Sequence, residues 1–144
     1  MDAGGEGGTR CNGLWPIELG CNDRVSNAAA VARRRHPAVN ASWRGERVRQ
    51  NHVINIGVAV AVDEGLLVPV VRNADGKGLS TIATEVKALA EKAKTKKLQP
   101  AEWEGSPFTI SNLGMFGIEE FTAILNPPEA PLLPAGAVTR TAVG

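Results

Sequence analysis

The residues of this sequence best suited to chemistry lie between positions 108 and 117. Residues 108–111, Phe-Thr-Ile-Ser, suit a β-strand, and Asn112-Leu113-Gly114-Met115-Phe116-Gly117 forms a glycine-rich bend directly after it. A strand that delivers a hydroxyl beside glycines lets a substrate approach the backbone closely and offers it a hydrogen bond. Taken alone, Ser111 is more simply interpreted as a hydroxyl that caps a turn.

Other chemistries find little support. Cys11 and Cys21 lie ten residues apart without a Cys or His partner at zinc spacing, so we expect reduced thiols in a reducing compartment and no metal site. The glycines of residues 4–8 lack the Gly-Lys-Ser/Thr of a phosphate-binding loop. Both observations leave the segment around Ser111 as the main candidate.

Composition fits one domain, or a piece of one, that can bury a core. The chain has 144 residues, of which 43% are hydrophobic and 22% are charged. A net charge of +1 gives no reason to expect nucleic acid or an anionic membrane as partner. No apolar stretch approaches the roughly 20 residues that a membrane-spanning helix needs, so we expect no membrane association.

The first half of the chain predicts a helix and then a hairpin. Residues 26–35 are Ala-rich and read as the end of a helix before Pro37, with Arg33-Arg34-Arg35 as cations that complement the helix dipole. Residues 54–62 alternate between bulky and small residues, which predicts a strand. After a turn at residues 63–65, residues 66–71 return as an antiparallel strand that Pro69 places at an edge or a bulge.

The second half predicts one long helix among strands. Residues 82–93 show helical spacing, with Ser80 available as the N-cap and lysines closing the helix. Residues 100–103 suit one more helical turn, and residues 121–125 suit a strand. Strands alternating with helices, in an order that includes a hairpin, predict an α/β layered domain with a mixed sheet.

Several ordered segments of the chain resemble the catalytic domain of the 2-oxoacid dehydrogenase acyltransferases. The resemblance covers residues 27–138, and within the family it is greatest to the acetyl-transferring, pyruvate dehydrogenase type. The segments that carry it are residues 36–43 (HPAVNASW), 54–60 (INIGVAV), 65–70 (GLLVPV), 108–117 (FTISNLGMFG) and 124–128 (ILNPP).

The resemblance implies a fold and a reaction. The fold is a two-layer α/β sandwich with a mixed sheet, similar to chloramphenicol acetyltransferase. The reaction is acetyl exchange between coenzyme A and a dihydrolipoyl group carried on a separate domain, without a metal. By the family's motif, Ser111 would donate a hydrogen bond to the developing oxyanion, and Asn112, Leu113 and Gly114 would help to shape the coenzyme A pocket.

The resemblance also implies partners. They are a homotrimer-based core, a lipoyl domain and the other components of a 2-oxoacid dehydrogenase complex, in the cytoplasm of a bacterial type of cell or alternatively in the mitochondrial matrix. On this basis we expect residues 1–22 to be a disordered or unrelated lead-in, and residues 23–144 to be a partial catalytic domain that is incomplete at its C-terminus.

One expected catalytic group is missing from the sequence. The family's base is a histidine in an Asp-His-Arg-x-x-Asp-Gly segment, which does not occur here. His36 fits the family's helix-end segment and His52 suits a surface position, so we expect neither to be the base. Pro131 and Pro134 should also weaken or displace the strand that follows residues 124–128. The alternatives are an acyltransferase chain that is inactive alone and a non-catalytic core or assembly subunit.

Overall fold

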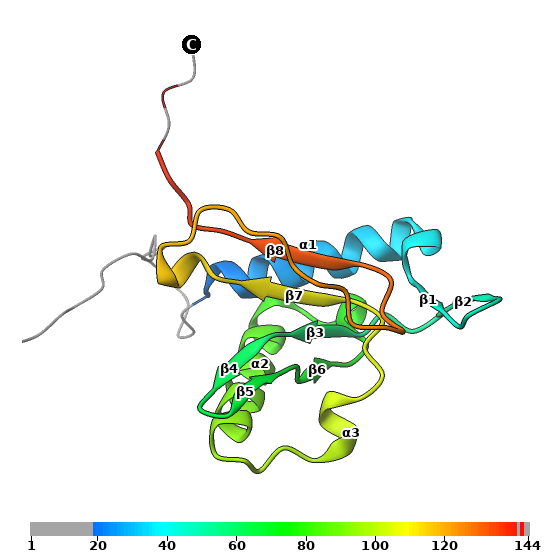
Figure 1. Ribbon diagram of the computed structural model, residues 1–144, viewed down its shortest axis with the longest axis horizontal. Coiled ribbons are helices and arrows are strands. Elements are labelled where there is room, and N and C mark those ends of the chain that lie inside the picture. The colour runs from blue at the N-terminus through cyan, green and yellow to red at the C-terminus, as the bar shows by residue number, and fades with distance from the viewer. Residues whose placement is uncertain (1–18, 141, 143–144) are drawn as a thin grey trace, which may run out of the picture.

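The computed structural model describes residues 19–140 and 142. Cys11 and most of the segment expected to be a lead-in therefore lie outside the described residues, whereas Cys21 and Asn22 already belong to the first helix. Figure 1 shows the elements in their order along the chain. They are α1 (Cys21–Arg35), η1 (Pro37–Val39), β1 (Ala41–Trp43), β2 (Val48–Gln50), β3 (Ile56–Val58), β4 (Val60–Val62), β5 (Gly65–Leu67), β6 (Val70–Val71), η2 (Ala74–Gly76), α2 (Leu79–Lys94), α3 (Pro100–Trp103), β7 (Thr109–Asn112), η3 (Gly114–Phe116) and β8 (Leu132–Ala135).

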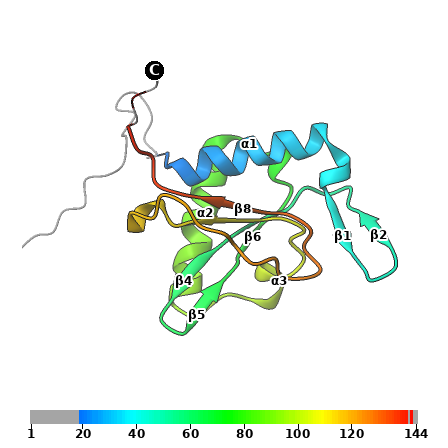
Figure 2. The ribbon, with the colours of Figure 1, turned by 45° about the horizontal axis from the view of Figure 1, so that its top comes forward.

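A four-stranded mixed sheet forms one layer of the fold. Its strand order is β6-β3-β7-β8, in which β6 runs antiparallel to β3 and the other two pairs are parallel. Helices α1 and α2 pack against each other and form the second layer (Figure 2). The predicted two-layer α/β architecture with a mixed sheet is therefore confirmed.

The hydrophobic core lies between the two helices and the sheet. Ile56 on β3, Ile82 on α2 and Ile110 on β7 are almost completely buried there. Burying an aliphatic side chain of this size contributes about 1.5–3 kcal/mol to folding. The same cluster holds Ala30, Ile54, Val58, Val71, Ala74, Leu89 and Phe108.

The predicted hairpin forms, but each of its strands is divided in two. The outer part pairs β4 with β5 through Val60↔Leu67, and the inner part pairs β3 with β6 through Ile56↔Val71. Pro69, which is buried and has no N–H to donate, separates β5 from β6. The expectation of one continuous strand over residues 54–62 was therefore wrong, whereas the edge position near Pro69 is confirmed because β6 is an edge strand.

Helix α2 begins at Leu79, two residues earlier than a cap at Ser80 would allow. Gly78 is its N-cap, and its carbonyl accepts the first helical hydrogen bond from the Ile82 N–H at 3.0 Å. Ser80 lies inside the first turn, so its assignment as N-cap was wrong. A cap at residue 78 follows from the compact η2 turn, which places Ala74 in the core next to the helix.

The expected strand over residues 121–125 was wrong, and the strand after it is not displaced by its prolines. Residues 121–125 form no strand, and Ile124 is 90% exposed. Apolar alternation makes a strand only where a partner strand is in reach, and no pairing to this segment occurs in the described chain. In contrast, β8 forms despite Pro134, because β8 is the edge strand of the described sheet, where a missing N–H is tolerated.

Candidate functional site

Ser111 lies near the carboxyl end of β7, half-buried and in register with Pro134 on β8. The parallel pairing of β7 with β3 on one side and with β8 on the other fixes the direction of this strand end. Within residues 19–140 and 142, no hydrogen bond engages the Ser111 hydroxyl. It is therefore available as a donor at the edge of the turn that follows.

The turn after Ser111 is held by its own hydrogen bonds. The Leu113 N–H donates to the Ala135 carbonyl at 3.0 Å, and the Gly114 N–H donates to Asn112 Oδ1 at 2.8 Å. The Asn112 amide in turn donates to Asn22 Oδ1 on α1 at 2.7 Å. Both backbone donors are thus already committed within the chain, and this turn can contribute to a binding pocket through its shape.

Close backbone packing fixes the position of the same turn. A Cβ atom on Gly114 would lie 2.7 Å from the carbonyl oxygen of Gly136, so only glycine allows the turn to approach the end of β8. The η3 turn then ends at Gly117, whose φ of 74° is in the left-handed region that favours glycine. The glycines predicted to form a tight bend are therefore used for close approach and for a positive φ.

A half-buried carboxyl, that of Glu129 in the loop before β8, contacts β7 further back along the strand. Glu129 accepts a hydrogen bond from Thr109 Oγ1 at 2.6 Å. Thr109 lies two residues before Ser111, so the two side chains are on the same face of β7. Burial raises the pKa of Glu129, while the Thr109 hydrogen bond and the charge of Arg33 oppose that rise. This contact joins the loop that precedes β8 to the strand that carries Ser111.

Sequence reasoning missed a buried arginine. Arg33 was interpreted as a helix-end cation, yet it is only 3% exposed and donates to the Asn55 carbonyl at 3.0 Å and to Asn40 Oδ1. Its guanidinium also stacks over the Phe108 ring, 4.7 Å from the centroid. Burial lowers the pKa of Arg33 to about 10, opposed by Glu129, so the group remains charged at neutral pH.

The spacing of α1 contains a signal for this burial. Ser26, Ala30 and Arg33 follow one another at four and three residues, which is the period of one helix face, and all three are buried. The arginine therefore occupies the next core-facing position after Ala30. It links α1 to the starts of β3 and β7, and so helps to set where the Ser111 strand lies.

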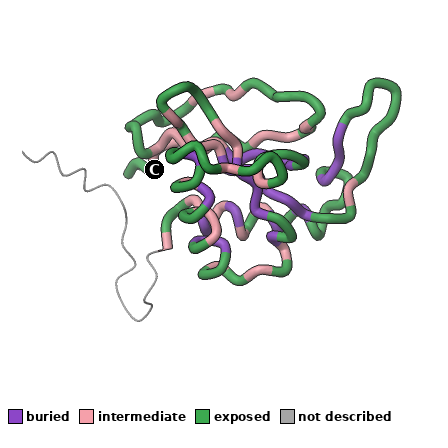
Figure 3. The backbone as a smooth tube through the Cα atoms, turned by 90° about the horizontal axis from the view of Figure 1, so that it is seen from below, coloured by how far each residue is buried: buried purple, intermediate pink, exposed green. Residues whose placement is uncertain are grey.

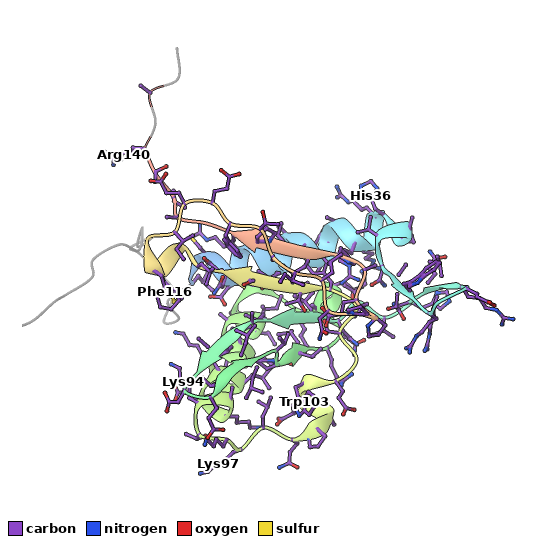
Figure 4. The ribbon with its side chains drawn as sticks, in the orientation of Figure 1. His36, Lys94, Lys97, Trp103, Phe116 and Arg140 are labelled. Atoms are coloured by element: carbon purple, nitrogen blue, oxygen red, sulfur yellow. The ribbon has the colours of Figure 1, made fainter. Side chains whose placement is uncertain are left out.

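The two histidines lie at the other end of the molecule. His36 caps the C-terminus of α1, far from the η3 turn marked by Phe116 in Figure 4. His52 is exposed and lines a shallow cavity of about 310 Å³ together with Arg33, Arg34 and Asp75. The predicted surface position of His52 is confirmed, and neither histidine is placed beside Ser111.

An open groove runs alongside β8. It has a volume of about 400 Å³ and is lined by Phe121, Leu125 and Pro131 among others, and by Pro134, the register partner of Ser111. In the described ranges, no group of three His, Cys, Asp or Glu side chains could hold a metal ion. None of the helices in those ranges is long and apolar enough to cross a membrane.

Comparison with known proteins gives the family. The model of the 2-oxoacid dehydrogenases acyltransferase (catalytic domain) family matches residues 12–144. The chain belongs to this family. A solved structure of the dihydrolipoamide acetyltransferase of Azotobacter vinelandii, studied for the roles of a serine, a histidine and an asparagine in its catalytic mechanism, superposes with a TM-score of 0.86 at 36% identity, over 90% of this chain and 54% of that one.

Curated relatives of this chain are named as components of pyruvate dehydrogenase complexes. The mitochondrial dihydrolipoyllysine-residue acetyltransferase component from Dictyostelium discoideum is 47% identical over 92% of the chain and 21% of its own length. The mitochondrial pyruvate dehydrogenase protein X component of Mus musculus is 48% identical over 83% of the chain and 24% of its own length.

A second solved structure, the cubic core of the pyruvate dehydrogenase multienzyme complex, has a TM-score of 0.86 at 37% identity, over 90% of this chain and 54% of that one. The chain thus spans about a fifth to a quarter of these curated relatives and about half of the solved chains.

Proposed function

We propose that this chain acts in acetyl transfer between coenzyme A and a dihydrolipoyl-lysine group, with Ser111 as the oxyanion donor. In this reaction a thiol sulfur attacks the thioester carbonyl of the acetyl donor, and a tetrahedral intermediate with a negative oxygen forms. The intermediate collapses by breaking the bond to the other sulfur, which leaves as a thiol after taking up the proton released by the first. A fixed donor to the negative oxygen lowers the barrier of both steps.

The position of the Ser111 hydroxyl carries this proposal. It stands at the end of a buried strand, without a partner in the described residues, beside a turn held rigid by Asn112 and by glycine packing. The A. vinelandii relative, whose mechanism was studied through a serine, supports the assignment. A single donor of this kind is worth about 10²–10³ in rate.

We assign Asn112, Leu113 and Gly114 to the wall of a coenzyme A pocket. Asn112 holds the turn through Gly114 and ties it to α1, so removing its amide would loosen both. Leu113 and Gly114 contribute the backbone contour, since their N–H groups already have acceptors. No metal is required, because the charge that develops on one oxygen is met by a hydroxyl donor.

The base that accepts the thiol proton comes from another chain in this proposal. His36 lies at the end of the molecule opposite the η3 turn, and His52 lines a cavity with Arg34 and Pro37 beside it, so neither can face Ser111 in the same copy. The family resemblance implies an active site shared between neighbouring subunits of a trimer. We therefore expect the isolated chain to supply the Ser111 half of a site and to show no turnover alone.

Partners and compartment follow from the relatives. We propose that the chain takes part in a pyruvate dehydrogenase complex core built on homotrimers, served by a lipoyl domain and the other components. The two curated relatives above are named mitochondrial, which favours the mitochondrial matrix over the cytoplasm.

A complementation assay tests the Ser111 assignment. The purified chain is mixed with the catalytic domain of a relative whose own strand-end serine is replaced by alanine, and acetyl transfer from acetyl-CoA to dihydrolipoamide is followed by loss of the thioester absorbance. We expect activity with the wild-type chain and a loss of about 10²–10³ with Ser111→Ala. Ser80→Ala, an exposed hydroxyl change on α2, serves as the matched control and should leave the rate unchanged.

A second candidate function is a non-catalytic core subunit. It is favoured by the 48% identity to the pyruvate dehydrogenase protein X component of Mus musculus, a relative whose name does not mention a transferase. In that case the mixed assembly would form with no gain of activity, and Ser111→Ala would behave like the wild-type chain. The same mixing experiment therefore distinguishes the two functions.

A further inference from the structure

A cavity at the C-terminal end of α1 is not used by the proposed chemistry. It has a volume of about 310 Å³ and lies where Figure 4 labels His36, far from the η3 turn that follows Ser111. The hairpin of β1 and β2, whose last residue lines the cavity, projects from the body and is largely exposed (Figure 3). We call it the basic cavity and define it by six of the residues that line it, which are Arg33, Arg34, Asn40, Gln50, His52 and Asp75.

The charge around the basic cavity is mostly positive. Two arginines stand against one carboxylate, that of Asp75, among the described residues that line it. Residues 33–54 supply most of the lining and contain six arginines and two histidines, but only one glutamate and no aspartate or lysine. A cavity with charge of one predominant sign raises the local concentration of oppositely charged ligands. The ligand class that this surface favours is therefore an anion.

Arg33 supplies its charge from the wall of the cavity. It is buried, its Nη1 and Nη2 donate to the neutral oxygens of Asn55 and Asn40, and the charge of Glu129 acts on it without forming an ion pair. Its Nε–H is buried and has no hydrogen-bond partner in the described part of the chain. A buried donor without a partner is uncommon in folded proteins, and a bound water or ion is one of its ordinary explanations.

The groups that can contact a ligand directly are exposed and come from different elements. Arg34 lies on α1, Gln50 ends β2, and His52 follows β2. Arg34 Nη1 lies 3.7 Å from Asp75 Oδ2, which is too far for a hydrogen bond, so the donors of this guanidinium remain available. A ligand in the cavity would thus meet donors from two sides.

We propose that the basic cavity binds a phosphate group, either of free phosphate or of a small phosphate ester. The oxygens of phosphate are strong acceptors in a tetrahedral arrangement, so they can accept hydrogen bonds from α1 and from the end of β2 at once. A carboxylate has only two oxygens in one plane and meets fewer of these donors. Arginine is also the residue most suited to phosphate, through its planar, multi-donor guanidinium.

Asp75 has a defined part in this site. Its carboxylate is half-buried beside Arg34 and competes with an incoming anion for the same guanidinium. A bound phosphate would join the end of α1 to the segment between β2 and β3. The site is separate from Ser111, so it goes beyond acetyl transfer and does not depend on it.

A nuclear magnetic resonance titration of the isotope-labelled chain tests the site. Inorganic phosphate is added at constant ionic strength, held with sodium chloride, and the backbone amide signals are followed. We expect the signals of Arg34, His52 and Asp75 to move together and to saturate, which gives a dissociation constant. A second titration with glycerol phosphate distinguishes a phosphate ester from free phosphate, and a third with acetate tests the preference over a carboxylate.

Three variants locate the binding. Arg34→Ala should raise the dissociation constant about tenfold or more, because it removes a charged donor. Asp75→Asn should lower the dissociation constant by up to about fivefold, because the competing negative charge is gone. The matched control is Arg35→Ala, an equally charged and exposed neighbour outside the lining, which should leave the constant within about twofold. Circular dichroism establishes that each variant is folded.

Several results would overturn the proposal. They are the lack of a saturable change with phosphate and with glycerol phosphate, signal changes confined to the lysine-rich end of α2, and equal effects of Arg34→Ala and Arg35→Ala. The last two would mean that basic charge alone attracts the anion. Acetate that binds as tightly as phosphate, or Asp75→Asn that weakens binding, would equally refute the assignment. Tighter binding of glycerol phosphate than of phosphate assigns the site to an ester, and the reverse order assigns it to free phosphate.

Discussion

Replacing Gly57 with alanine tests how closely β3 and β7 are packed beneath the Ser111 strand. Gly57 is buried in β3, with β6 on one side and β7 on the other, and its N–H donates to the Phe108 carbonyl at 2.8 Å. A Cβ atom at this position would lie 2.6 Å from Val68 Cγ1, 2.9 Å from Thr109 Oγ1 and 3.1 Å from Ser106 Oγ. These contacts come from side chains on both sides, so the strand cannot move away from one without approaching another.

The expected magnitude follows from two opposing contributions. Overpacking by one methyl group in a closed site costs about 1–3 kcal/mol, whereas the loss of glycine freedom in the unfolded chain stabilises by about 0.4–1 kcal/mol. The net expectation for Gly57→Ala is a free energy of unfolding lower by about 1–2 kcal/mol. The matched control is Gly76→Ala, where a Cβ would meet nothing within 4 Å, and which should be neutral or slightly stabilising.

Urea unfolding followed by circular dichroism measures both variants against wild type. The double variant Gly57→Ala with Val68→Ala removes the shortest contact. Its loss in free energy of unfolding should therefore be smaller than the sum of the losses of the two single variants, by about 0.5–2 kcal/mol. Equal stability of Gly57→Ala and Gly76→Ala would refute the packing argument. So would a double variant whose two effects simply add.

Three further changes probe the groups around the Ser111 strand. Arg33→Ala leaves two buried acceptors without their donor and should lower the free energy of unfolding by about 2–4 kcal/mol in urea titrations. Arg35→Ala, at an exposed position, should change the free energy of unfolding by less than about 0.5 kcal/mol. Equal effects of the two changes would contradict the buried network. Because burial raises the pKa of Glu129, its contribution to stability is complete below the pKa of the unfolded chain and is lost as pH rises through the raised value. Glu129→Gln should therefore gain stability relative to wild type as pH rises above the ordinary range of a carboxyl pKa and through the raised pKa of Glu129, and a difference that does not vary with pH would contradict this. Asn112→Ala removes the hydrogen bonds to Asn22 at 2.7 Å and from the Gly114 N–H at 2.8 Å. It should therefore weaken coenzyme A binding, which calorimetry of the mixed assembly measures. Unchanged binding would contradict this assignment.

Local patterns in the sequence predicted the parts of this fold that depend on neighbouring residues. The hairpin of β4 and β5, the end of α1 at Arg35 and the single turn of α3 follow from turn residues, charge and helical spacing. The strand that delivers Ser111 was recognised from its residues and extends one residue further, to Asn112. In each case the determining interactions lie within a few residues of one another.

The features that the sequence did not reveal depend on distant contacts. Residues 121–125 have strand-like alternation but no partner in reach, and β8 tolerates Pro134 because it lies at an edge. The burial of Arg33 depends on Asn40 and Asn55, which come from segments that only the fold brings together. The assignments of Ser111, Asn112, Leu113 and Gly114 to the coenzyme site remain predictions that the complementation assay addresses.

The most direct measurement of the central claim is acetyl transfer by the mixed assembly of this chain with a relative that lacks its own strand-end serine. The account predicts measurable turnover with the wild-type chain, no turnover by the chain alone, and a loss of about 10²–10³ in rate with Ser111→Ala but not with Ser80→Ala. Turnover that Ser111→Ala leaves unchanged would contradict it.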